Sequence, residues 1–256
     1  MIIYQEYPPC PQLAPYLACL WTCHVLPGAA SVTHRVLPDN CIDILWQNSA
    51  APAQVAGMMS SAIHVHIAQP VRTIAVRFKP GAAAHFFALP LHQLADLHPA
   101  LDALWPPGVA AQFDDALWAR PLDEHQALHV VQSLLQSLLL RRLQASPPPA
   151  HAGLAQAAVA AIERSGGAIR IASLAQSLGV SRQHLANQFR ARVGLGAKQF
   201  ARVCRFRTAC ARIGATPARA LDWARLAQEL GYYDQPHLIH EFRELSGSTP
   251  ESFARA

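Results

Sequence analysis

One segment in the second half of the chain occurs twice, and this duplication restricts the fold more than any other feature. Eight apolar or small positions match between the two copies. The first four recur 52 residues later, as Leu174, Ala175, Leu178, Gly179 and then Leu226, Ala227, Leu230, Gly231. The other four recur 53 residues later, as Leu185, Phe189, Gly194, Phe200 and then Leu238, Phe242, Gly247, Phe253. The repeat predicts one structural unit that is present twice.

Each copy has the residue types of two short helices joined by a tight turn. Ala175 is the small residue where the first helix would pass close to the second, and Gly179 permits the positive φ that ends the first helix. Ser181 can cap the next helix. Leu185 and Phe189, four residues apart, would anchor that helix to the core. This pattern predicts a helix-turn-helix, whose second helix enters the major groove of DNA.

The segment between the copies predicts a linker helix. Ala197 to Ile213 would be about 25 Å long at 1.5 Å per residue. Such a helix could hold two recognition helices about one DNA turn, roughly 34 Å, apart. Residues 151–256 carry 14 Lys/Arg and 7 Asp/Glu, whereas residues 1–150 carry 7 and 9. The basic second half favours a polyanionic partner, and double-stranded DNA read in two successive major grooves fits both observations.

The second copy resembles the signature of a known family. Gly231–Pro250, GYYDQPHLIHEFRELSGSTP, is similar to the signature of AraC-type transcription regulators. Ser181–Phe189 with Val193 and Gly194 resembles the first recognition helix of that family, and Arg205 and Ala209 fit its linker helix. The resemblance covers about residues 154–255. It implies a DNA-binding domain of seven helices that recruits or blocks RNA polymerase.

The resemblance implies that base-facing residues lie early in each recognition helix. The matching positions are Gln183, Ala186 and Asn187 in the first unit and Gln235, Pro236, Ile239 and His240 in the second. Gln183 and Asn187 can each bond adenine N6 and N7, whereas Pro236 lacks a donor. Ile239 could touch a thymine methyl, and His240 stands where many relatives carry Arg. We therefore predict asymmetric recognition, in which the first unit makes most of the base contacts. The alternative is that these residues are exposed polar side chains that do not read bases.

Candidate phosphate contacts are mostly cationic residues on or beside the recognition helices. They are Ser181, Arg182, His184, Arg190, Arg192, Lys198 and Arg243. For any single arginine, a solvated surface charge is the alternative interpretation.

The first half predicts an α+β domain, a small sheet with helices or a cupin-like barrel. Residues 41–46 and 71–78 are expected as strands, and 82–104 as helical segments interrupted at Pro90 and Pro99. Residues 123–144 predict a helix whose apolar face packs on its own domain or forms a homodimer. The expected boundaries are 1–144 for this domain, 145–153 for a Pro-rich linker and 154–256 for an all-α domain with two helix-turn-helix units.

Two segments of the first half, Pro38–Trp46 and Val76–Gly81, resemble an uncharacterised sensor-like domain that often precedes AraC-type domains. This match covers roughly residues 5–105 and assigns no ligand. We expect a small-molecule effector at an unassigned site. Two alternatives stay open: a domain that only dimerises or binds a protein partner, and a cysteine enzyme that accepts alkyl groups at Cys19 or Cys23.

Other chemistry is missing from the sequence, which has no catalytic triad elbow, phosphate loop or dinucleotide fingerprint. We therefore expect no enzyme activity, no catalytic residues and no cofactor. His64 and His66 would share a face of a strand at 63–67, but no neighbour completes a metal site. The six cysteines lack zinc-finger spacing. Without a signal peptide or an apolar stretch near 18 residues, we expect a cytoplasmic protein with free thiols.

Overall fold

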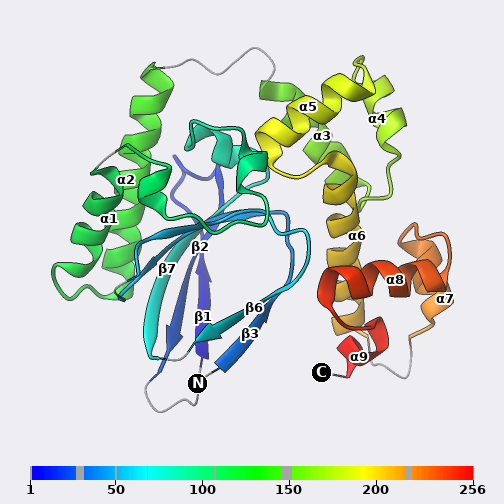
Figure 1. The fold of residues 1–256 in the computed structure, drawn as a ribbon, viewed down its shortest axis with the longest axis horizontal. Coiled ribbons are helices and arrows are strands. Elements are labelled where there is room, and N and C mark those ends of the chain that lie inside the picture. The colour runs from blue at the N-terminus through cyan, green and yellow to red at the C-terminus, as the bar shows by residue number, and fades with distance from the viewer. Residues whose placement is uncertain are drawn as a thin grey trace.

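The computed structural model describes residues 2–26, 32–49, 51–67, 69–106, 108–145, 152–216 and 221–255. A β-rich N-terminal part lies beside an all-helical C-terminal part (Figure 1). The strands are β1 Ile2–Tyr7, β2 Leu17–Val25, β3 Val32–Val36, β4 Ile42–Gln47, β5 Gln54–Ala56, β6 Ile63–Ile67 and β7 Val71–Phe78.

Five of these strands form one antiparallel sheet in the order β1-β2-β7-β4-β5, and β3 pairs with β6 separately. Strand β7 has the predicted bounds. We expected one buried face from Ile74, Val76 and Phe78, and all three are buried. Thr73 and Ala75 on the other face are buried as well; both lie on β7, the central strand, which β2 and β4 flank.

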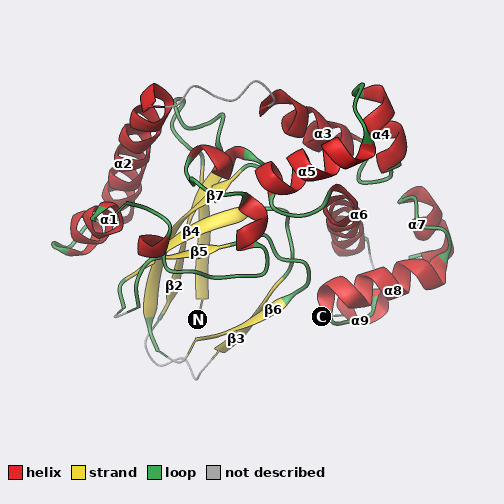
Figure 2. Cartoon of the chain, turned by 45° about the horizontal axis from the view of Figure 1, so that its top comes forward, coloured by secondary structure: helices red, strands yellow, loops and turns green. Residues whose placement is uncertain are grey.

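The N-terminal helices are α1, Val109–Trp118, and α2, Glu124–Ala145. They lie on the side of the sheet away from the C-terminal helices (Figures 1 and 2). The apolar face predicted for α2 is buried within the chain, which confirms packing on its own domain; its residues are Leu128, Val131, Leu135, Leu138 and Leu139. The predicted helical region before α1 forms three short 3-10 helices, η1 Ala82–His85, η2 Leu91–Leu94 and η3 Leu101–Ala103.

The C-terminal part has seven helices among the described residues, as the resemblance implied. They are α3 Ala152–Arg164, α4 Ile171–Ser177, α5 Arg182–Val193, α6 Ala197–Gly214, α7 Trp223–Glu229, α8 Gln235–Ser246 and α9 Pro250–Ala254. Helix α6 starts where the linker helix was predicted and ends one residue later. Most of the predicted Pro-rich linker, residues 146–151, lies outside the described residues.

The buried apolar residues form two cores. The first runs without a break from the sheet, through Phe86 and Leu91, to Leu185 and Phe189 of the first helix-turn-helix unit. The second core belongs to the other unit and is centred on Phe206 and Phe242. The first unit is therefore part of the same core as the N-terminal domain, whereas the second unit has its own. Across the described ranges, no helix has the length and apolarity that a membrane crossing requires.

Candidate nucleic-acid interface

The first unit consists of α4 and α5 with the predicted turn between them. Gly179 has φ +68°, a left-handed conformation that a residue with a Cβ rarely adopts, and it ends α4. Ser181 caps α5, because its Oγ accepts a hydrogen bond from the backbone N–H of His184 at 3.1 Å. Leu185 and Phe189 are fully buried. The sequence predictions of turn, cap and anchor are confirmed for this unit.

The outward face of α5 carries the three predicted base readers. Gln183, Ala186 and Asn187 are exposed and lie three and four residues apart, which places them on one face of the helix. Within the described part of the chain, neither Gln183 nor Asn187 has a side-chain hydrogen bond. Both amides therefore remain available to a ligand outside the chain.

The second unit repeats this scheme in α7 and α8. Gly231 has φ +75°, and Oδ1 of the capping residue Asp234 accepts a hydrogen bond from the His237 N–H at 2.8 Å. Pro236 lies in the first turn of α8, where a missing N–H costs no helical hydrogen bond. The other predicted readers are Gln235 and Ile239, both half-buried, and His240, which is exposed with its Nε2 3.4 Å from Glu244 Oε1.

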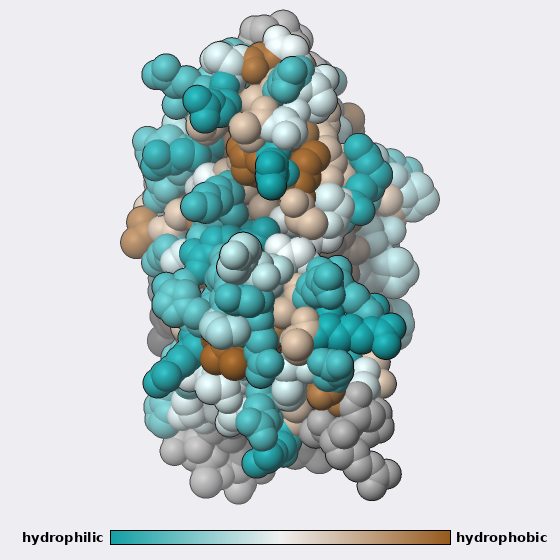
Figure 3. Space-filling view, turned by 90° about the vertical axis from the view of Figure 1, so that its right-hand side faces the viewer, coloured by the Kyte–Doolittle hydropathy of each residue, from teal (hydrophilic) through white to brown (hydrophobic). Residues whose placement is uncertain are grey.

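The predicted phosphate contacts divide into two groups. Arg182, Arg190, Lys198 and Arg243 are exposed on the C-terminal helices, a side of the molecule that is mostly hydrophilic (Figure 3). Arg192 instead lies at the domain interface, where it lines a small hollow with Gly81 and His85 of the N-terminal domain. The last two are Ser181, whose hydroxyl caps α5, and His184, which is half-buried.

A buried ionic network that the sequence analysis missed joins α8 to α6. Glu241 of α8 is 6% exposed, and its Oε1 accepts a hydrogen bond from Arg202 Nε at 2.9 Å. Its Oε2 accepts another from Arg205 Nη2 at 3.2 Å. Burial alone would raise the pKa of Glu241, but the two guanidinium groups lower it below its ordinary value. The network fixes the second recognition helix on the linker helix.

Arg205 has two further partners. Its Nη1 donates to the carbonyl of Gly167 at 2.8 Å, and its guanidinium lies over the Tyr232 ring at 5.4 Å from the centroid. Spacing of apolar residues could not have revealed this network, because it depends on a buried acid. The one sequence signal was Glu241 itself, an acidic residue next to Phe242 on the buried face of the helix.

The N-terminal domain holds the linker helix through a tight turn before β4. Asn40 has φ +64° and is buried, and its Nδ2 donates to the carbonyl of Phe200 on α6 at 2.9 Å. Beside it, Nη1 of Arg207 donates to the carbonyl of Asp39 at 3.1 Å. These contacts attach the N-terminal domain to the helix that joins the two units.

The N-terminal domain also touches each unit directly. Helix α5 packs against η1 and η2. On the other unit, Arg35 of β3 donates to Ser248 Oγ at 3.1 Å and lies over the ring of Phe253 at 5.7 Å. The backbone N–H of Ala62 donates to the carbonyl of Leu245 at 2.8 Å. The relative placement of α5 and α8 therefore depends on the N-terminal domain as well as on α6.

The two histidines predicted to share a strand face do so on β6. His64 and His66 lie on β6 as predicted, and both are exposed. Over the described ranges, no group of three or more His, Cys, Asp or Glu side chains could hold a metal ion.

Two capped helix-turn-helix units on one linker helix define the class of the protein: it is a DNA-binding protein of the helix-turn-helix type. Comparisons with known proteins agree. Residues 174–256 match a family described as a helix-turn-helix domain, and residues 5–100 match a domain of unknown function, DUF6597. The C-terminal part of the chain is an AraC-type helix-turn-helix domain, and the protein is a DNA-binding transcription regulator.

Among solved structures, three matches cover part or most of this chain. The C-terminal domain of AraT, a response regulator from Geobacillus stearothermophilus, is 21% identical, with coverage of 43% of this chain and 85% of that chain and a TM-score of 0.37. ToxT from Vibrio cholerae O395 is 9% identical, with coverage of 99% and 97% and a TM-score of 0.46. ToxT of strain SCE256 with a bound unsaturated fatty acid is 10% identical, with coverage of 99% and 94% and a TM-score of 0.42. A comparison with curated proteins found no match.

Proposed function

We propose that this regulator reads specific DNA sequences in two successive major grooves and that its first unit makes most of the base contacts. The observation that carries the proposal is the outward face of α5, where Gln183 and Asn187 are exposed and unbonded to any described residue. Helix α6 has 18 residues and so is about 27 Å long, which suits units that read neighbouring turns of one DNA duplex. In the second unit, Ile239 and His240 offer fewer groups for base reading.

The test is a comparison of operator and random DNA for the Asn187→Ala variant. An amide that bonds adenine in pairs contributes ~1–3 kcal/mol of discrimination, about 5- to 150-fold in relative affinity. We expect the variant to lose discrimination at one or two base pairs of a site selected with the unaltered protein. Gln112→Ala, an exposed position on α1, serves as the control. Equal losses of affinity on operator and random DNA would show that Asn187 does not read bases.

Arg190 is expected to act on the DNA backbone instead. It is exposed near the end of α5, and no described side chain forms an ion pair with it. Arg190→Ala should weaken binding to all sequences alike and reduce the slope of log affinity against log salt by about 1. Fluorescence anisotropy over a salt series measures this slope, and Arg120→Ala in the N-terminal domain is the matched control. An unchanged slope would mean that Arg190 neutralises no phosphate.

We also propose that a small molecule modulates DNA binding through the N-terminal domain. The support is a cleft of about 540 Å³ between that domain and α3, within the size range of small-molecule sites. It is an open and charged cleft. A domain that only dimerises or binds a protein partner is the alternative, because most small-molecule sites are enclosed and lined by apolar side chains.

The alternative of an alkyl-accepting cysteine lacks such support. Burial raises the pKa of Cys19 to about 11, and it also raises the pKa of Cys23. Since the thiolate is the nucleophile, both groups would be mostly protonated and weakly reactive at neutral pH.

A further inference from the structure

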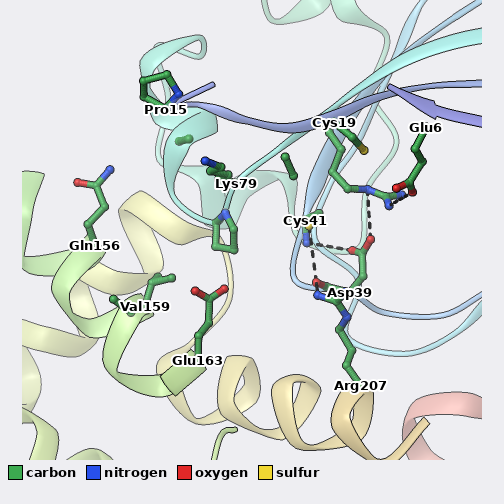
Figure 4. A pocket seen from close by; sticks show the side chains of 15 residues that line it. Glu6, Pro15, Cys19, Asp39, Cys41, Lys79, Gln156, Val159, Glu163 and Arg207 are labelled. Atoms are coloured by element: carbon green, nitrogen blue, oxygen red, sulfur yellow. Dashed lines mark hydrogen bonds and ion pairs between the residues drawn. The ribbon is translucent and has the colours of Figure 1, made fainter. Parts of the chain in front are cut away.

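The two sides of the cleft between the domains carry different side chains. On the N-terminal side, Asp39, Cys41 and Arg77 line it, and on the other side α3 contributes Gln156 and Glu163 (Figure 4). Any molecule in this interdomain cleft would touch both the sensor-like domain and the DNA-binding domain.

The arginine that lines the cleft from β7 is already paired. Arg77 Nη2 lies 3.1 Å from Asp43 Oδ2, its Nε lies 3.4 Å from Asp39 Oδ2, and its Nη1 lies 3.6 Å from Glu6 Oε1. One guanidinium therefore faces three carboxylates, and this group has an excess of negative charge. An anionic ligand would have to displace one of these acids to reach Arg77.

The other two cations of the cleft are also engaged. Lys79 Nζ donates to the carbonyl of Ala14 at 2.6 Å, and Arg207 donates to the carbonyl of Asp39 at 3.1 Å. Neither forms an ion pair with a carboxylate among the described residues. Both are nevertheless held by backbone oxygens.

Glu163 differs from these groups because its carboxylate has no hydrogen bond or ion pair within the described residues. Figure 4 shows its side chain directed from the last turn of α3 into the cleft. Partial burial raises its pKa, and the charge of Arg207 opposes that rise. Arg207 acts on this exposed carboxylate through its charge only and forms no ion pair with it, so a ligand can still supply a cation in direct contact with Glu163. The neighbouring apolar surface consists of short aliphatic groups, among them Pro15 and Val159.

We propose that the interdomain cleft binds a small organic cation, a protonated aliphatic amine whose ammonium group is held by Glu163 and whose carbon chain lies on the apolar surface. Binding itself does not depend on the proposed function. The effect on DNA binding does rest on the proposed function. Helix α3 packs on the recognition helix α5, so an amine that binds one position of α3 more tightly than another shifts the protein toward that position.

The experiment uses the full chain and three probes of equal chain length, hexylamine, hexan-1-ol and hexanoate, in isothermal titration calorimetry. We expect saturable binding of hexylamine alone. Glu163→Gln keeps the shape of the side chain and removes the charge, so it should weaken hexylamine binding about tenfold or more. Glu251→Gln, an exposed acid on α9, should leave binding unchanged. Circular dichroism of each variant checks that it is folded.

Three outcomes would overturn the assignment of the cleft: no saturable binding of hexylamine, tighter binding of hexanoate, or unchanged binding in Glu163→Gln. Anisotropy with operator DNA, with and without hexylamine, tests the regulatory part separately. A change in DNA affinity that Glu163→Gln abolishes supports it. Amine binding with unchanged DNA affinity overturns the regulatory part only. Absence of sequence-specific DNA binding by the unaltered chain, both with and without hexylamine, would instead contradict the proposed function.

Discussion

Glu241→Ala is expected to lower the free energy of unfolding by about 3–5 kcal/mol, because removing one partner of a buried ion pair leaves uncompensated charge behind. The charge left without a carboxylate partner is that of Arg205, whose side chain is 15% exposed, whereas Arg202, at 22% exposed, keeps its ion pair with Glu244. Urea unfolding followed by circular dichroism measures the loss. The same variant should bind operator DNA less tightly, because α8 loses its attachment to α6.

Glu244→Ala is the matched control for this prediction. Glu244 also pairs with Arg202, but its side chain is 48% exposed, so its loss should cost no more than about 1 kcal/mol. Similar losses in the two variants would show that burial of Glu241 does not set the strength of the network.

The same network predicts how stability depends on pH. The folded pKa of Glu241 lies below the ordinary glutamate value of 4.5, so the ion pairs stabilise the fold fully above that value. Their contribution is lost as the pH falls through the lowered folded pKa. The Glu241→Gln variant has no carboxylate at this position to protonate, so it lacks this pH-dependent contribution to stability. We therefore expect the stability difference between the unaltered chain and Glu241→Gln to shrink as the pH falls below 4.5.

Gly167→Ala is the second substitution with a large expected effect. Gly167 has φ +82°, and a Cβ at this position would lie 2.1 Å from the carbonyl oxygen of Ala201 on α6. The left-handed conformation costs ~1–2 kcal/mol and overpacking ~1–3 kcal/mol, so we expect a loss of about 2–5 kcal/mol. Thermal and urea unfolding measure it. The shift of α6 should also weaken DNA binding.

A substitution at the neighbouring glycine separates the cost of the left-handed conformation from the cost of overpacking. Gly166 has φ +58°, but the nearest atom to its Cβ would be Thr208 Oγ1 at 3.9 Å, an ordinary contact. Gly166→Ala should therefore show the conformational cost alone, about 1–2 kcal/mol. If both variants lost the same stability, the close approach of the α3–α4 loop to α6 would not matter.

Much of the helix-turn-helix structure could be predicted, because the sequence patterns that specify it involve residues close together in the chain. The turn at Gly179, the cap at Ser181 and the anchors Leu185 and Phe189 depend on residues within a few positions of one another. The same holds for β7 and for the apolar face of α2. Because the segment is repeated, the helix-turn-helix pattern occurs in both copies, which strengthens the prediction.

The domain interface could not be predicted, because its partners lie far apart in the sequence. Arg192 had the residue type of a phosphate contact, yet it lines the interface with His85. The pair Asn40 and Phe200 is separated by 160 residues. A periodic pattern indicates that a face is buried, but it does not identify the surface that covers that face.

The sequence by itself therefore determined two helix-turn-helix units, their caps and the exposed amides of the first, since these follow from local backbone and periodicity. Only the tertiary structure decided that the two units differ in their attachment. The first shares the core of the N-terminal domain, and the second is held on α6 by Glu241 and its arginines. The physical reason is that a continuous core and a buried ion pair both depend on which surfaces meet in three dimensions.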